Sequence, residues 1–325
     1  MNALVLGPLV ETALSVAPVS ESILQPLWGG YGVLGRVHLK DGRDVVVKRV
    51  RLPAAPEEGS SEWRSFDRKR RSYDVERRFY ADYVPRLSAL PIPRAYCAER
   101  TGEGWLFVLE DLAAAGLPAK VLRPTPRQLS ECLKWLARFH ATFLNVAPAG
   151  LWPEGGYWHL AVRNDEFLRM QESALKREAS RWDARLRKAK WRTLIHGDAK
   201  PENFCFGANG TARQAGLSVG AVDFQYVGGG AGIKDVAYLL SCCLSERECA
   251  VLCGDLIDEY FLALRSELSE RGHAAMATAI EAEWRTLYPI AWADFCRFLD
   301  GWAQEPLHGY SRRMVQRAMS ASEGL

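Results

Sequence analysis

The sequence His196-Gly197-Asp198-Ala199-Lys200-Pro201-Glu202-Asn203 brings an acid and an amide close together in the chain. Asp198 can accept a proton from a hydroxyl group, and Asn203, five residues later, can ligand a metal ion. Twenty residues further on, Asp223 lies between two apolar residues, and this second acid can hold the same metal. Asp, Asn and Asp in this order and at this spacing are typical of sites that transfer a phosphoryl group.

Each of these side chains also has a simpler structural interpretation. Asp198 can cap a turn, Asn203 can be a turn residue, and Asp223 can be a buried acid with a satisfied partner. Their joint spacing favours chemistry, and burying an ionised Asp223 between apolar neighbours is costly without a strong partner such as a metal. Lys200, two residues after Asp198, can reach a transferring phosphate, with a solvated loop lysine as the alternative.

An apolar, β-branched strand upstream ends in a lysine, in the sequence Val45-Val46-Val47-Lys48. A lysine in this position needs an acid or a phosphate as its partner. Glu76, in the next predicted helix, is the expected partner, in the strand-lysine and helix-glutamate pairing that positions nucleotide phosphates. The alternative for Glu76 is a plain surface helix, since Asp74 is nearby.

A glycine-rich turn precedes this strand and is a candidate for phosphate binding. Gly29, Gly30 and Gly32 lie between two predicted strands, where their backbone N–H groups can approach a phosphate. A turn without a ligand is the alternative, and the turn is not a Walker loop, because no Gly-Lys-Ser/Thr follows. Glu110 and Leu112 lie where the two halves of the chain join, and their backbone can bond an adenine edge.

The periodicity of the sequence divides the chain into two unlike halves. Strand patterns cover residues 23–28, 33–39, 44–50, 96–100 and 105–109, with one helix over 63–83. Helical spacing then dominates, over 129–143, 164–190 and from 234 onward, with short strands at 193–195, 204–206 and 219–224. We therefore predict an α+β, two-lobed protein-kinase-like fold with a ligand cleft between its lobes. The lobes are a small β-rich N-lobe over residues 1–112 and a larger, mainly helical C-lobe over residues 113–325.

Composition narrows the class of protein. Of 325 residues, 48% are hydrophobic and 25% are charged, which is typical of a folded globular chain. The net charge of +3 is too small to indicate a nucleic-acid or membrane partner. The apolar N-terminus has no basic start, and no apolar run reaches the roughly 18 residues of a membrane span. We therefore expect a cytoplasmic protein, and the eight scattered cysteines are expected to be free thiols.

Together these residues resemble the aminoglycoside phosphotransferase and choline kinase superfamily, whose members phosphorylate hydroxyl groups of small molecules. The loop at 196–203, the sequence Asp223-Phe224-Gln225 and the segment 287–295 look most like its ecdysteroid-kinase-like branch and bacterial relatives. The resemblance covers roughly residues 24–310 and implies ATP and Mg²⁺ as cofactors. It implies Asp198 as the base, Asn203 and Asp223 as metal ligands, and Lys48 on the phosphates. It also implies an acceptor pocket among the C-lobe helices, for which the candidate residues are Trp284, Tyr288, Trp292 and Asp294. Packing in the core is the alternative role for these four.

A protein kinase is one alternative function, and the sequence argues against it. Gly197 stands where protein kinases have an arginine, and Gln225 replaces the glycine of their Asp-Phe-Gly. A glycine-rich segment, 228–232, leads directly to Asp235, which is expected to cap the following helix, and no Ala-Pro-Glu follows. This leaves no room for a peptide-binding activation segment and favours a small-molecule acceptor.

A kinase-shaped module that binds nucleotide without turnover is a second alternative, from a different class. The sequence does not name the acceptor, choose between ATP and GTP, or give the oligomeric state. The many aromatic residues of the C-lobe suit a hydrophobic or a cationic acceptor.

Overall fold

The N-terminal part of the chain is built around one antiparallel sheet. The structure is a computed structural model, and it describes residues 6–87, 90–207, 218–303, 307 and 309–323. Five strands pair in the order β1-β2-β3-β5-β4. Their bounds are Pro18–Pro26 for β1, Gly32–Leu39 for β2, Asp44–Arg51 for β3, Ala95–Thr101 for β4 and Gly104–Glu110 for β5. All five predicted strands are therefore present, and β1 begins earlier than predicted.

Helices cover both faces of this sheet. Because side chains alternate along β3, Val45 and Val47 join the apolar layer beneath α1 (Gly7–Leu14), whereas Val50 joins the layer on the α2 (Ser61–Arg78) side. Helix α1 was not predicted. The Glu21 carboxylate of β1 accepts hydrogen bonds from the N–H groups at its start, where the helix dipole favours an anion.

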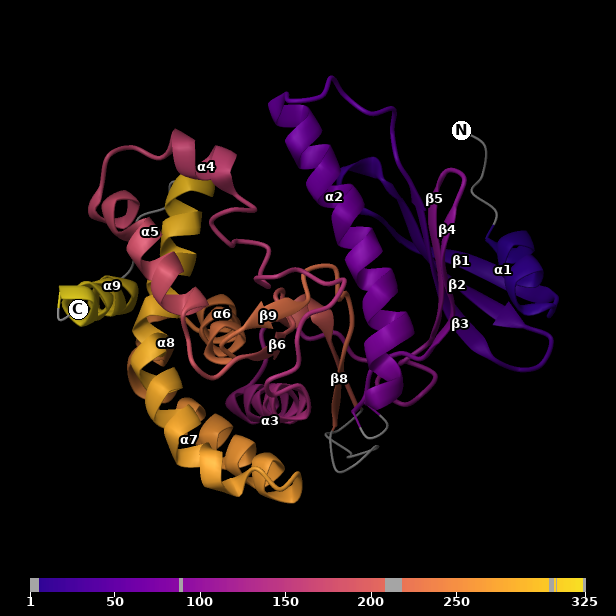
Figure 1. Cartoon of the computed structure of the whole chain (residues 1–325). Helices are drawn as coiled ribbons and strands as arrows, with labels where there is room; N and C mark the ends of the chain where they lie inside the picture. Colours follow the sequence, from indigo (N-terminus) through magenta and orange to yellow (C-terminus); the bar gives the residue numbers. More distant parts are fainter. Residues whose placement is uncertain (1–5, 88–89, 208–217, 304–306, 308, 324–325) are drawn as a thin grey trace.

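Helix α2 joins the two lobes. Ser60 caps its start, and beyond Arg78 the chain widens into a π-helical turn, η2 (Phe79–Tyr83), before it tightens into a 3₁₀ turn, η3 (Val84–Arg86). Figure 1 shows α2 standing between the sheet and the helices of the large lobe. At its end, Phe79 stacks on Phe224 with ring centroids 4.2 Å apart. The segment that carries Glu76 is thus fixed against the loop that carries Asp223.

The large lobe is mainly helical. Its helices include α3 (Pro126–Thr142), α6 (Ile233–Cys243), α7 (Glu246–Glu270), α8 (Ala274–Trp302) and α9 (Gly309–Glu323). Side-chain capping boxes begin both α3 and α7. Two short antiparallel pairs lie among the helices: β6 (Thr193–Ile195) with β9 (Gly228–Gly230), and β7 (Phe204–Phe206) with β8 (Val219–Ala221). The four strands position the two loops that carry the predicted acids.

The single helix predicted over 164–190 is wrong. The structure has two helices there, α4 (Asn164–Arg169) and α5 (Ala174–Arg187). Met170 turns to an extended conformation and is buried, and the Ser173 hydroxyl accepts a hydrogen bond from the Lys176 N–H, 3.2 Å away. A serine side chain competes with helical backbone bonds in this way, so a break starts a second helix.

The predicted capping role of Asp235 is also wrong. Helix α6 begins after Gly232, which makes no side-chain cap, and Asp235 lies inside the first turn. Its buried carboxylate instead accepts hydrogen bonds from the N–H groups of His196 (2.6 Å) and Gly197 (3.0 Å). It also contacts His140 at 3.2 Å. Asp235 therefore fastens α6 to the start of the loop at 196–203.

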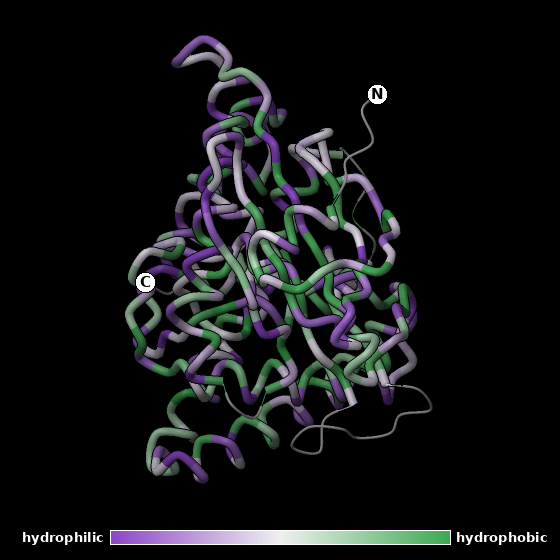
Figure 2. Tube along the Cα trace, turned by 90° about the vertical axis from the view of Figure 1, so that its right-hand side faces the viewer, coloured by the Kyte–Doolittle hydropathy of each residue, from purple (hydrophilic) through white to green (hydrophobic). Residues whose placement is uncertain are grey.

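One hydrophobic core runs through both lobes. It extends from Trp105 and Phe107 of β5, through Phe79, to Phe139 of α3 and Phe224. In Figure 2, hydrophobic segments gather toward the inside of the molecule and most hydrophilic segments lie at its edges. The division of the chain at residue 112 stays a prediction, since the core crosses it. Within the described ranges, no helix is long and apolar enough to cross a membrane.

Candidate active site

The loop at 196–203 follows β6 and ends in the short 3₁₀ turn η4 (Pro201–Asn203). Its backbone passes close to another loop at Gly197, which has a φ of +77°. A Cβ atom at Gly197 would lie 2.1 Å from the Tyr226 carbonyl oxygen and 2.7 Å from the Gly156 nitrogen. Glycine is therefore required by both conformation and space, and an arginine does not fit here.

His196 holds the loop from inside. One imidazole nitrogen, Nε2, lies 3.1 Å from the Val222 carbonyl oxygen, and the other accepts a hydrogen bond from the Asp198 N–H at 3.2 Å. Burial lowers the pKa of His196, although Asp235 and Asp223 oppose this. A neutral ring that donates through Nε2 fits both contacts. The prediction that His196 bonds backbone in this loop is confirmed.

Asp198 is buried at the centre of a polar cluster. The Tyr238 hydroxyl on α6 donates to its Oδ1 at 3.1 Å, and the Asn203 amide donates to its Oδ2 at 3.1 Å. Lys200 Nζ lies 3.4 Å from the same Oδ2. Burial raises the pKa of Asp198 to about 7, against the opposing charge of Lys200 and with the help of Asp223. A carboxylate with this pKa can accept a proton near neutral pH.

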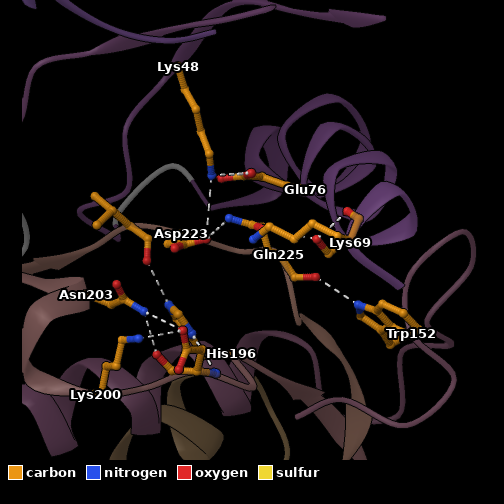
Figure 3. Close-up of polar contacts among 12 residues, drawn as sticks. Lys48, Lys69, Glu76, Trp152, His196, Lys200, Asn203, Asp223 and Gln225 are labelled. Carbon is orange, nitrogen blue, oxygen red and sulfur yellow. Dashed lines mark hydrogen bonds and ion pairs between the residues drawn. The ribbon is translucent and has the colours of Figure 1, made fainter. Parts of the chain in front are cut away.

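Asp223 lies on the neighbouring loop in an uncommon backbone conformation. Its φ is +67°, a left-handed value that a non-glycine residue adopts at a cost of about 1 kcal/mol. Its Oδ1 accepts a hydrogen bond from the Gln225 amide at 2.8 Å and lies 3.7 Å from Lys48 Nζ (Figure 3). Burial opposes ionisation, but nearby lysines outweigh burial and lower the pKa of Asp223 to about 2. This carboxylate is ionised at any physiological pH.

Lys48 and Glu76 form a buried ion pair, with Lys48 Nζ 2.7 Å from Glu76 Oε2. The lysine comes from β3 of the sheet and the glutamate from α2. Burial disfavours the charged lysine, but Asp223 and Glu76 outweigh it and raise its pKa. The expected partner of Lys48 is thus in place, and the lysine keeps its charge while it faces Asp223.

A second lysine, which the sequence analysis missed, reaches the same site from α2. Lys69 Nζ donates to the Gln225 side-chain oxygen at 2.8 Å, and the Ser72 hydroxyl donates to the same oxygen at 3.0 Å. These two donors fix the amide so that its nitrogen faces Asp223 (Figure 3). Lys69 lies seven residues, or two helical turns, before Glu76, and this spacing on one helix face was the available signal.

The glycine turn and the joint between the lobes flank this cluster. Gly29, Gly30 and Gly32 have φ values of +70°, +75° and +138°, which suit glycine. A Cβ atom at Gly32 would lie 2.0 Å from the Arg49 carbonyl oxygen, so the turn is pressed against β3. At the joint, the Glu110 N–H donates to Arg94 O and the Leu112 C=O accepts from Leu117 N–H.

The comparison with protein families decides the relationship of this chain. A model of the phosphotransferase enzyme family matches residues 23–277. The chain belongs to that family. The match spans the glycine turn, the Lys48 strand and both acid-bearing loops, and it confirms the resemblance inferred from the motifs. No curated protein gives a significant match.

Solved structures share the fold of this chain. A candidate fructosamine-3-kinase from Thermobifida fusca superposes with a TM-score of 0.56 at 15% identity, over 99% of both chains. Choline kinase LicA from Streptococcus pneumoniae gives a TM-score of 0.50 at 12% identity, over 98% of this chain and 99% of its own. These neighbours confirm the predicted two-lobed, protein-kinase-like fold.

The four acceptor candidates lie in the core of the large lobe. The Trp284 indole donates to the Trp191 carbonyl oxygen, and the Trp292 indole donates to the Ser311 hydroxyl, each at 3.0 Å. Asp294 pairs with the fully buried Arg297, and Tyr288 is buried beside Trp292. These contacts favour the packing alternative for all four. The tyrosine that does reach Asp198 is Tyr238, which no local pattern had marked.

Proposed function

We propose that this protein is an ATP- and Mg²⁺-dependent kinase that phosphorylates a hydroxyl group of a small organic molecule. One observation carries the proposal: two neighbouring loops hold two aspartates, a buried one with a pKa of about 7 and a half-buried one with a pKa of about 2. Phosphoryl transfer needs both a proton acceptor and a permanently charged metal ligand. Membership of the phosphotransferase enzyme family supports the reaction class.

The residues present fit a magnesium nucleotide. Asn203 uses its amide nitrogen to bond Asp198, so its amide oxygen is the atom suited to a cation beside Asp223. Among the described residues, no three His, Cys, Asp or Glu side chains gather as a metal site. A hard cation that takes a few protein oxygens and completes its shell with phosphate and water fits such a donor set, and Mg²⁺ is that kind of cation.

Residues of the small lobe would hold the rest of the nucleotide. Lys48, kept charged by Glu76, would bind phosphate oxygens, and the backbone of residues 29–32 would cover them. The Glu110 C=O and the Leu112 N–H would bond the adenine edge. When bound, Mg-ATP supplies the transferable phosphoryl group and neutralises part of its charge.

Asp198 is the proposed base. It takes the proton of the acceptor hydroxyl while that oxygen bonds the phosphoryl group, and ADP is the leaving product. Tyr238 and Asn203 hold the carboxylate in place from two sides. Lys200 is near enough to Asp198 to stabilise the charge that develops on the transferred group.

Two alternatives remain from the sequence. A kinase-shaped binding module without turnover needs no base, so the arrangement around Asp198 gives it no support. A protein kinase needs an activation segment, yet Asp223 is followed within five residues by β9, which pairs directly with β6. The short connection favours a small acceptor.

Coupled ADP release with Mg²⁺, ATP and a panel of hydroxylated small molecules tests the proposal, with Asp198→Asn as the control. We expect an acceptor-dependent signal that the substitution abolishes. Nucleotide binding with no ADP release across the panel would contradict the proposal and favour the silent module.

A further inference from the structure

A cavity of about 460 Å³ lies between the first half of α2 and the segment 152–165 of the large lobe. Its walls include the tryptophans Trp63 and Trp152 and the arginines Arg68 and Arg71. His159 and Val162 also line it. Cavities of this size hold small molecules in other proteins. The sequence analysis assigned none of these residues to a site.

The acids of this cavity are already paired with arginines. Asp165 lies 2.8 Å from Arg64, and Asp67 lies 2.6 Å from Arg70. Glu154 contacts Arg192, at 2.7 Å. Because each carboxylate has its own cation, the walls offer little uncompensated negative charge to a cationic ligand.

Two arginines of the cavity have no such acid. In the part of the chain that the structure describes, the ion pairs within 4.0 Å include neither Arg68 nor Arg71. Arg68 donates to the Val162 carbonyl oxygen at 3.1 Å and to the Ser65 hydroxyl at 3.2 Å, both neutral acceptors. Burial lowers the pKa of Arg68 and the charge of Arg163 lowers it further, while the charges of Glu166 and Asp165 act in the opposite direction. Arg71 is exposed, whereas Arg68 is partly buried and donates to these neutral acceptors. A partly buried cation of this kind favours an anionic ligand.

The aromatic faces near the cavity already carry protein cations. The Arg71 guanidinium lies 4.2 Å from the centre of the Trp152 ring. Arg163 lies 5.5 Å from the Tyr157 and Phe298 rings. A cationic acceptor would normally use such faces, but here it would meet an arginine on each. The structure thus argues against the cationic acceptor that the aromatic composition allowed.

The cavity is connected to Asp198 through a row of tyrosines. Tyr226 stacks on Trp152 with centroids 6.0 Å apart and also contacts Tyr157 at 6.0 Å. The Tyr157 hydroxyl lies 3.4 Å from that of Tyr238, which donates to Asp198. The charges of Arg68, Arg163 and Asp198 all act on the pKa of Tyr226, so this tyrosine lies near both the arginines and the proposed base.

Arg68 also affects the pKa values of two tyrosines outside the cavity wall. Burial raises the pKa of Tyr31, in the glycine turn, and the positive charge of Arg68 opposes this. Burial also raises the pKa of Tyr226, and the positive charges of Arg163 and Arg68 oppose this. Arg68 is thus close enough to influence both the small-lobe turn and the large-lobe loop beside Asp198.

We propose that the acceptor carries an anionic group, such as a carboxylate, on an apolar or aromatic body. Arg68 and Arg71 bind this group in the cavity while the acceptor hydroxyl lies at Asp198. The assignment of an acceptor rests on the proposed kinase function. The binding of an anion at Arg68 does not, and it is tested separately.

The binding test uses benzoate and benzylammonium, which have similar size and opposite charge, titrated calorimetrically into the full chain. We expect wild type to bind benzoate at least about tenfold more tightly, and Arg68→Gln to lose about tenfold or more, the value of a charge-assisted hydrogen bond. Arg77→Gln removes the same charge from α2 outside the cavity and should leave binding unchanged. No saturable binding of benzoate, or equal binding by the Arg68 and Arg77 variants, would overturn the proposal.

A turnover test separates this inference from the kinase proposal. ADP release is measured with 4-(hydroxymethyl)benzoate and with its methyl ester, which keeps the hydroxyl but lacks the charge. Preference for the acid, lost in Arg68→Gln, supports the inference. Preference for the ester overturns it and leaves the kinase proposal intact. Binding of benzoate through Arg68 with no ADP release from either compound supports the anion site and counts against the kinase proposal alone.

Discussion

The loop at 196–203 and the loop at 222–226 each carry one aspartate, and the surroundings of the two side chains differ. Asp198 bonds a tyrosine and an amide, with one lysine near it, and burial raises its pKa to about 7. Asp223 is half-buried, and although its loss of solvent opposes ionisation, Lys48, Lys69 and Lys200 lower its pKa to about 2. Loss of solvent acts against the charge of both carboxylates, and the larger number of lysines around Asp223 makes the difference.

This contrast separates two roles in one cleft. A base must be able to release its proton and take another near the working pH, whereas a metal ligand must stay ionised. The lysines that protect the charge of Asp223 come from β3, α2 and the loop at 196–203. The division of roles therefore depends on how the small lobe is seated on the large one.

The largest effect is expected from removing the base. Asp198→Asn keeps the shape and the hydrogen bond from Tyr238 but cannot accept a proton. We expect turnover to fall at least about 10²-fold, the lower range for loss of a general base, while the unfolding temperature changes little. Steady-state ADP release measures this effect. A variant that keeps full turnover would remove Asp198 from the mechanism.

A smaller effect is expected from removing the charge of Lys48, which contacts Glu76 and Asp223. Lys48→Met keeps the length of the side chain but removes its charge and its proposed phosphate contacts. We expect the KM for ATP to rise by about 10- to 100-fold, as for the loss of a charge-assisted hydrogen bond. Arg49→Met, on the opposite face of the same strand, is the matched control. Equal KM values for both variants would contradict the role of Lys48.

The contact between Lys69 and Gln225 is expected to fix the orientation of the Asp223 carboxylate. Gln225→Ala removes the amide that bonds Asp223, and Lys69→Met frees that amide to rotate. We expect the Mg²⁺ concentration for half-maximal activity to rise by a few-fold up to about tenfold in each, the value of one hydrogen bond. Because the charge of Lys69 also acts directly on Asp223, Lys69→Met should have the larger effect, and adding Gln225→Ala to it should change little further. Independent, additive effects would argue against this chain of contacts.

The smallest expected effect is on the pH dependence of kcat/KM. Since burial raises the pKa of Asp198 to about 7, it is protonated below that pH, and kcat/KM should fall as the pH drops below about 7. Tyr238 donates to the carboxylate and opposes that shift, so Tyr238→Phe should move the midpoint upward by about 0.5–1 pH unit. A pH–rate profile gives both values. A midpoint that moves downward would show that Tyr238 does not stabilise the charged base.

Local sequence was sufficient to predict much of the fold. The apolar, β-branched run of β3 and the helical spacing of α3 each depend on neighbouring residues, and each element was placed within a few positions. The pairing of Lys48 with Glu76 was also expected, because a charged residue at the end of an apolar strand demands a partner. These inferences need only the chemistry of a short stretch.

The remaining features depend on contacts between distant residues. Gln225 meets Lys69 across 156 positions, and Asp235 meets the backbone of His196 across 39. No local pattern shows that the Asp235 carboxylate is used by another loop instead of capping its own helix. Trp284 and Trp292 likewise show no local sign of whether they line a pocket or fill the core. Only the packing of the helices decides between these outcomes.

The most direct test of the two roles is to measure binding of Mg²⁺ with a non-hydrolysable ATP analogue to Asp198→Asn and Asp223→Asn side by side. We predict that Asp198→Asn binds the magnesium nucleotide as tightly as wild type, whereas Asp223→Asn loses the dependence of binding on Mg²⁺. Equal loss of affinity in both variants, or unchanged Mg²⁺ dependence in Asp223→Asn, would contradict the division of roles between the two aspartates.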